Sequence, residues 1–107
     1  MPHDDFTAFV LDQLHALGPI IARSMFGAYG LYHRGAFFAI SSGGRLYFKT
    51  IPATRADYER HGMQPFRPNA RQTLVNYYEV PADILEDSTL LARWARAALG
   101  LPTHNPD

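Results

Sequence analysis

The chain has 107 residues, a length typical of one domain. Its ten Lys or Arg and ten Asp or Glu residues give zero formal net charge, and this balance argues against a strongly basic nucleic-acid binder. Cysteine is absent, which excludes a disulfide framework, a zinc–thiolate site and a thiol nucleophile, and which fits a reducing compartment. The acidic start has no signal-peptide pattern and no stretch approaches the length of a membrane span, so we expect one cytoplasmic domain over residues 1–107 that does not contact a membrane.

Apolar residues near the N-terminus recur at helical spacing. They are Phe6, Phe9, Val10, Leu14 and Leu17. Asp4 or Asp5 can cap this helix, because a short carboxylate accepts hydrogen bonds from the unpaired N–H groups of the first turn. Gly18 and Pro19 are typical of a helix end. The pattern therefore predicts a helix that stops at Gly18.

Four strands joined by glycine-containing segments are predicted next. They cover residues 20–26, 29–33, 36–41 and 45–50. Gly27 and Gly30 bracket a bend or bulge between the first two strands, because glycine tolerates backbone angles that other residues avoid. Arg34-Gly35 and Ser42-Gly43-Gly44 are typical of hairpin turns. This block predicts an antiparallel meander rich in aromatic residues.

The alternation of side chains assigns faces to the third and fourth strands. In the third strand, we expect Phe38 and Ile40 to share one face. In the fourth strand, Leu46 and Phe48 share a face, and the other face carries Arg45, Tyr47 and Lys49. One face of the sheet should therefore pack on helices, and the other should be partly solvated.

A short helix around Tyr58 is predicted after the meander, beginning at Pro52 and ended by Gly62. The next segment, residues 63–69, holds two prolines, so we expect it to be irregular with a brief strand at most. Residues 71–80 alternate as a further strand, with large side chains on both faces.

A last helix is predicted from Asp83, or from Asp87 and Ser88, as far as Gly100. Its apolar stripe consists of Leu90, Leu91, Trp94, Ala95 and Ala98. Residues 101–107 are expected to form a loose tail. The order α-β-β-β-β-α-β-α predicts an α+β two-layer sandwich, in which helices cover one face of an antiparallel sheet. The other face would be open, or closed by a second copy of the chain.

No cluster of residues specifies a reaction. The histidines lack the spacing of zinc ligands, so we interpret them as polar surface: His3, His15, His33, His61 and His104. The serines lie in no G-x-S-x-G motif, and adjacent carboxylates on a helix point apart. Gly27-Ala-Tyr-Gly30 lacks the lysine of a phosphate-binding loop. We therefore expect no catalytic residue, no metal and no cofactor, and we predict that the chain is not an enzyme.

The partly solvated face carries the candidate functional residues. The predicted interaction surface comprises Arg23, Phe26, Tyr29, Tyr32, Tyr47 and Lys49. Tyrosine is enriched at protein interfaces, so this surface favours protein contacts and a homodimer. A first alternative is direct nucleic-acid binding, because cations interleaved with aromatic rings are typical of single-strand platforms; its candidates are Arg23, Arg34, Arg45 and Lys49. A second alternative is a small-molecule binder or an enzyme of unknown reaction.

An ordered series of residues carries a family resemblance. The series is Arg23-Ser-Met-Phe-Gly27, Gly30-Leu-Tyr32, Gly35, Phe38-Ala39, Leu46-Tyr-Phe-Lys49, Tyr58, Gly62, Pro65-Phe66, Tyr77-Tyr-Glu-Val-Pro81, Leu91 and Trp94. In this series the chain resembles the N-terminal domain of the TfoX/Sxy family. The resemblance covers about residues 6–98 and implies a two-layer α+β domain similar to that of secretion chaperones.

The resemblance also implies a class of function. Well-known members of the family are bacterial regulators of natural competence that act with the cyclic-AMP receptor protein at promoters, and they carry a second, C-terminal domain. The family supplies no agreed catalytic residues. We therefore expect a non-enzymatic, cytoplasmic regulatory or protein-interaction module with a transcription regulator as partner.

Overall fold

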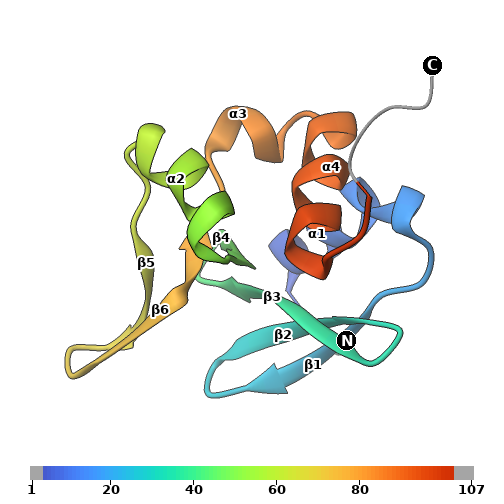
Figure 1. The fold of residues 1–107 in the computed structure, drawn as a ribbon. Coiled ribbons are helices and arrows are strands. Elements are labelled where there is room, and N and C mark those ends of the chain that lie inside the picture. The colour runs from blue at the N-terminus through green and yellow to red at the C-terminus, as the bar shows by residue number, and fades with distance from the viewer. Residues whose placement is uncertain (1–3, 103–107) are drawn as a thin grey trace.

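The computed structural model describes residues 4–102 and shows an α+β fold with a six-stranded antiparallel sheet in the order β1-β2-β3-β4-β6-β5 (Figure 1). The strands are β1 (Ile21–Met25), β2 (Ala28–His33), β3 (Ala36–Ser42), β4 (Arg45–Lys49), β5 (Pro65–Asn69) and β6 (Gln72–Glu79). The helices are α1 (Asp5–Gln13), η1 (His15–Leu17), α2 (Pro52–Arg60), α3 (Ala82–Leu85) and α4 (Ser88–Leu99). The predicted fold class is confirmed. Most of the expected C-terminal tail, residues 103–107, lies outside the described residues.

One face of the sheet is covered by the helices, which lie above it in Figure 1. Helix α4 packs on β3 and β4, and α2 packs on β6. The main core forms between these layers, and its fully buried members include Val10, Leu14, Leu31, Phe38, Phe48 and Leu91. We call this side of the sheet the helix-covered face.

Helix α1 is shorter than predicted, because the chain tightens into the 3₁₀ turn η1 before Gly18. This turn buries Leu17, whose carbonyl oxygen accepts a hydrogen bond of 2.9 Å from His33 Nε2. His33 is only 7% exposed, so the prediction of a polar surface position was wrong for this histidine. His15 and His61 are exposed as expected, and the remaining two, His3 and His104, lie outside the described residues.

A β-bulge in β3 changes the predicted faces. Leu31 pairs with Ala39, but the next residue of β2, Tyr32, pairs with Phe37, so Phe38 is an extra residue without a partner on β2. Phe38 therefore turns toward the helices, whereas Ile40 lies in a cluster on the opposite face. The expectation that Phe38 and Ile40 share a face was wrong, because strict alternation does not continue through a bulge.

The segment expected to be irregular contains β5, the edge strand beside β6. An edge position accommodates its prolines, because a proline there need not donate to a ladder hydrogen bond. Pro65 pairs with Tyr78, but Phe66 pairs with Leu74, so residues 75–77 have no partners on β5. The irregular register breaks the ladder between these two strands, and Phe66 packs across the sheet against Tyr47, with ring centroids 4.7 Å apart.

The C-terminal helical region divides into α3 and α4 where a single helix was predicted. Asp87 caps α4 by accepting a hydrogen bond of 3.1 Å from Leu90 N–H, and Gly100 ends it in the left-handed conformation, with φ 74°. Within residues 4–102, no helix combines the length and the apolar character required to cross a membrane.

Candidate functional site

The side of the sheet opposite the helices, which we call the second face, carries an apolar cluster of its own. Its buried members are Ala28, Ile40 and Phe66. Around them pack the partly buried side chains of Met25, Phe37, Tyr47, Leu74 and Tyr77. Four members of this cluster were not predicted as site residues, because neither the bulge in β3 nor the extent of strand β5 was predicted: Phe37, Phe66, Leu74 and Tyr77.

Aromatic rings on the second face stack on one another. The centroids of Tyr32 and Phe37 lie 5.2 Å apart, and those of Phe37 and Tyr77 lie 5.3 Å apart. The guanidinium of Arg23 lies 5.6 Å from the ring centroid of Tyr32, a cation–π distance. These contacts cover ring faces within the chain, so the rings offer little free surface for stacking of an external base.

The absence of a side chain at Gly30 lets Met25 and Phe37 pack closely over the strand. A Cβ at this position would lie 2.9 Å from Met25 Sδ, which would have to shift, and 3.1 Å from Phe37 Cε1, which is tighter than most such contacts. Gly30 therefore serves close packing of side chains over the strand, whereas Gly27 (φ 77°) serves the turn.

A hollow of about 460 Å³ lies between the β1–β2 turn and the β5–β6 hairpin. We call it the apolar hollow because Met25, Ala28, Phe66 and Leu74 line much of it. Its polar lining includes Ser42, Arg67, Asn69 and Gln72. The volume falls within the range of roughly 300–1,000 Å³ that is usual for ligand pockets.

Phe26 stands at the rim of the apolar hollow, in the two-residue turn between β1 and β2. Its φ of 49° and the φ of 77° at Gly27 are those of a type I′ turn, which favours Asn-Gly. A left-handed conformation costs a residue such as phenylalanine roughly 1–2 kcal/mol. The ring is 99% exposed, so burial against the described residues does not offset this cost. Backbone strain of this kind clusters at functional sites, so Phe26 is a candidate binding residue.

The structure brings together most, but not all, of the predicted interaction surface. Arg23, Tyr32 and Tyr47 lie on the second face, Phe26 lies at its rim, and Lys49 is exposed at the end of β4. Tyr29 pairs with Ser41, whose hydroxyl lies 2.7 Å from Thr7 Oγ1 of α1. Tyr29 therefore belongs to the helix-covered face, because side chains alternate along β2 and Tyr29 lies an odd number of positions from both Gly30 and Tyr32, which belong to the second face.

The four candidate nucleic-acid contacts do not form one compact cluster. Arg45 is paired with Glu79 at 3.0 Å, and Arg34 occupies the β2–β3 turn with φ 51°. Arg23 lies over Tyr32, and Lys49 is exposed at the other end of β4 from Arg45. Two arginines that sequence analysis missed, Arg67 and Arg71, lie on the β5–β6 hairpin.

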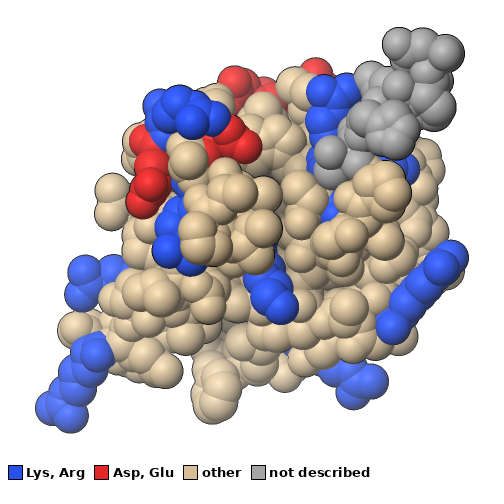
Figure 2. All heavy atoms as spheres, in the orientation of Figure 1, with Lys and Arg blue, Asp and Glu red and all other residues tan. Residues whose placement is uncertain are grey.

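The zero net charge conceals a segregation of charge between the two layers. The strands and their turns carry six cations, Arg23, Arg34, Arg45, Lys49, Arg67 and Arg71, but one carboxylate, Glu79. The helices of residues 4–102, with their caps and junctions, carry Arg55, Arg60, Arg93 and Arg96 against Asp4, Asp5, Asp12, Asp57, Glu59, Asp83, Glu86 and Asp87. In Figure 2 the red carboxylates lie over the helices together with some blue side chains, and further blue side chains lie over the sheet. The sheet layer is therefore cationic and the helical layer is anionic.

The family model of the TfoX N-terminal domain matches residues 12–101. The chain belongs to the TfoX N-terminal domain family. A curated relative, the DNA transformation protein TfoX1 of Aliivibrio fischeri, is 36% identical over 66 residues. The match covers 60% of this chain and 32% of the relative, so the matched segment spans about a third of that protein's length. The predicted family resemblance is confirmed.

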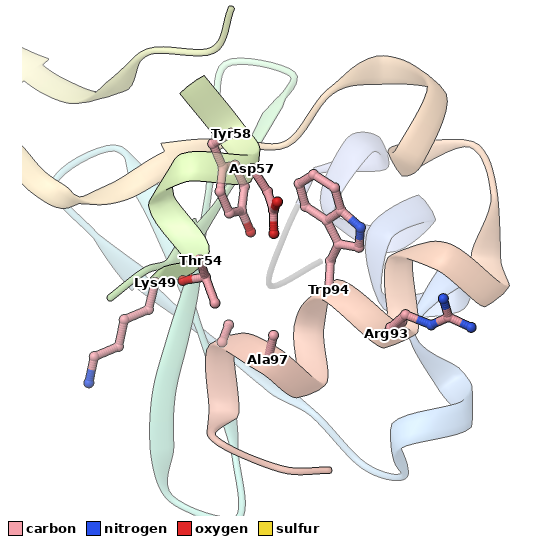
Figure 3. Close-up of a pocket in the computed structure, with 8 residues that line it drawn as sticks. Lys49, Thr54, Asp57, Tyr58, Arg93, Trp94 and Ala97 are labelled. Carbon is pink, nitrogen blue, oxygen red and sulfur yellow. The ribbon is translucent and has the colours of Figure 1, made fainter. Parts of the chain in front are cut away.

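This TfoX N-terminal domain has a second, smaller hollow of about 150 Å³ between α2 and α4 (Figure 3). The rings of Tyr58 and Trp94 meet edge to face there, with centroids 4.8 Å apart, while Lys49 and Arg93 point away from it. Burial raises the pKa of Tyr58, and the nearby carboxylate of Asp57 adds to the shift, so this phenol loses its proton less easily than a solvent-exposed tyrosine. The small size and the inert phenol indicate a packing feature of the helical layer.

The described side chains are not arranged as a set of metal ligands. Within residues 4–102, His, Asp and Glu side chains form no group of three or more that could hold an ion. The expected absence of metals, of cofactors and of catalytic residues stays a prediction.

Proposed function

We propose that this TfoX N-terminal domain is a non-enzymatic, cytoplasmic regulatory module that binds another protein through the second face, in a role related to DNA transformation. The name of the Aliivibrio fischeri relative, a DNA transformation protein, supports the role. The exposed and left-handed Phe26 beside the apolar hollow carries the proposed mode of action. A transcription regulator is the proposed class of partner.

Photo-crosslinking in the native host tests this function. Replacement of Phe26 by p-benzoylphenylalanine should give covalent adducts with a protein that survive nuclease treatment. The same replacement at Asp12, exposed on α1, is the matched control and should give none of these adducts. Absence of protein adducts at position 26, or their loss on nuclease treatment, would contradict a protein-binding module.

A transformation assay tests the proposed role separately. A strain that carries Phe26→Ala at wild-type abundance should transform less frequently, by about tenfold, if the lost contact is worth about 1.4 kcal/mol. Unchanged transformation at equal abundance would contradict the role while leaving the crosslinking result to decide the mode of action.

A specific observation favours self-association as a second activity. The two edges of the sheet differ, since β5 contains Pro65 and Pro68 with irregular pairing, whereas β1 is regular and has no proline. Prolines and bulges protect an edge from pairing with another chain. We propose a homodimer in which β1 pairs with β1 of a second copy.

Sedimentation over a range of concentrations tests the homodimer. Ile21→Lys places a charge on β1 and should shift the protein toward monomer. Ile51→Lys is the matched control, because Ile21 and Ile51 are 56% and 58% exposed and Ile51 lies outside the sheet. A wild-type protein that stays monomeric at all concentrations would contradict this proposal.

Direct nucleic-acid binding is the competing function, and the cationic sheet layer favours it. Phosphate contacts make affinity fall steeply as salt rises, whereas an apolar protein interface responds weakly. A salt titration with oligo(dT) therefore separates the two functions. Absence of binding near physiological salt would remove the nucleic-acid function.

A further inference from the structure

We propose that the apolar hollow binds an acidic protein segment, whose apolar side chains enter the hollow while its carboxylates pair with Arg67 and Arg71. This inference rests on the proposed function in that the partner is a protein. It adds the chemistry of the partner and the residues that recognise it.

The lining of the apolar hollow suits an aliphatic or aromatic side chain. Met25 of β1 and Leu74 of β6 both line the hollow, and Phe66, which also lines it, is buried. Methionine adapts its shape to different apolar ligands because it is unbranched and polarizable. Phe26 at the rim adds an exposed ring that would cover an inserted side chain.

The cations at this hollow are available to a partner. Arg67 lines the hollow and makes one weak contact, from Nη2 to the carbonyl oxygen of Ala70 at 3.4 Å. Arg71 does not line the hollow itself but lies in the β5–β6 turn, between the lining residues Asn69 and Gln72, and its backbone N–H donates to Asn69 Oδ1 at 2.9 Å. Among residues 4–102, no carboxylate forms an ion pair with either guanidinium, whereas Arg45 is paired with Glu79. Arginine binds carboxylates through two parallel hydrogen bonds, so an acidic segment fits these free groups.

Charge also distinguishes between occupants of the hollow. A second copy docked hollow to hollow would place the cationic hairpins of both copies together, and such repulsion opposes docking. A single-stranded nucleic acid would satisfy the cations, but the rings of Tyr32, Phe37 and Tyr77 already stack on one another. The acidic segment satisfies both the apolar lining and the unpaired arginines.

Fluorescence anisotropy of the full chain tests this inference with a labelled synthetic peptide in which Glu alternates with Leu and Phe. We expect saturable binding, and we expect Arg67→Gln with Arg71→Gln to weaken it by about tenfold or more. The matched control removes two cations from α4, by Arg93→Gln with Arg96→Gln, and should change the affinity by less than about twofold. Peptides with Lys in place of Glu, or with Ala in place of Leu and Phe, should bind far more weakly.

Several outcomes would overturn the inference. Absence of binding, equal losses in both double variants, or equal binding of the Ala-containing peptide would show that the hollow and its arginines do not recognise the peptide. Oligo(dT) that displaces the peptide and itself loses affinity in the hairpin variant would assign the surface to nucleic acid. If the hairpin variant unfolds more readily, Arg67→Lys with Arg71→Lys keeps the charges but loses the paired hydrogen bonds, so its affinity should lie between those of the wild type and of the Gln variant.

The failure of this inference is distinguishable from failure of the proposed function. Protein adducts at position 26 together with an inert acidic peptide would refute the acidic partner but keep the protein-binding module. Absence of protein adducts would refute the module itself.

Discussion

The two faces of the sheet are built from the same strands but have different properties. On the helix-covered face, Leu31, Phe38 and Phe48 are fully buried, and Thr7 and Ser41 satisfy each other's hydroxyl groups. On the second face, most apolar side chains are half-buried, and Phe26 is almost completely exposed in a strained conformation. The difference indicates that the first face supplies most of the stability, and we propose that the second face supplies contacts with other molecules.

The largest expected effect is on the helix-covered face. Phe38→Ala should lower the free energy of unfolding by about 3–5 kcal/mol, because it leaves a cavity beside Phe48 in the core. Urea denaturation measures this loss. Its neighbour on the second face, Phe37, is half-buried, so Phe37→Ala should cost much less. Equal losses would contradict the assignment of these neighbours to opposite faces by the bulge.

A smaller loss is expected from overpacking the second face. Gly30→Val should cost about 1–3 kcal/mol, because its new side chain would meet Met25 Sδ and Phe37 Cε1. Thermal or urea unfolding measures the change. Met25→Ala in the same chain should recover part of the loss, since it removes the nearer obstacle. Strictly additive effects of the two substitutions would show that they do not share this contact.

At alkaline pH, the stability of the fold should depend more on Tyr58 of the helical layer than on Tyr77 of the second face. The raised pKa of Tyr58 means that the folded chain keeps a proton that the unfolded chain loses above about pH 10. Its stabilising contribution is therefore complete below that pH and is lost above it, by at most about 1.4 kcal/mol per pH unit. Unfolding measured between about pH 9 and pH 11 should show this decline, and Tyr58→Phe should flatten it.

The matched variant for the alkaline experiment is Tyr77→Phe. Burial also raises the pKa of Tyr77, but its ring is half-buried on the second face. This substitution should therefore remove less of the pH dependence than Tyr58→Phe removes. The reverse order would contradict the contrast between the two faces.

The smallest expected effect has the opposite sign. Phe26→Asn should raise the free energy of unfolding by about 1 kcal/mol, because asparagine tolerates the left-handed conformation of this turn. The same substitution should weaken binding of the acidic peptide. A variant that loses stability, or one that binds the peptide as well as the wild type, would contradict the role of Phe26 as an external anchor.

Local patterns predicted much of the fold. The meander from β1 to β4 was confirmed with boundaries close to those expected, because each of its three turns contains glycine at positive φ. The bulge at Phe38 was not predictable, since it depends on pairing with β2 rather than on the composition of β3. Strand β5 was missed because its prolines argue against a strand unless its edge position is already known.

The candidate site was less predictable than the fold. Arg23, Phe26, Tyr32 and Tyr47 were identified from aromatic residues near glycines, but the arginines of the β5–β6 hairpin were not. Arg67 lines the hollow because the hairpin lies across it from the β1–β2 turn, about 40 residues earlier in the chain, and Arg71 lies in the turn of the same hairpin. Composition also concealed the cationic sheet layer, because a net charge sums both layers.

The unequal edges of the sheet limit how copies of the chain can assemble. Each copy offers β1 for pairing, while the prolines and irregular register of β5 oppose growth at the other side. Association along β1 about a twofold axis would use up this strand in both copies. Assembly by this route would end at a closed pair, and the chain would not extend into fibrils.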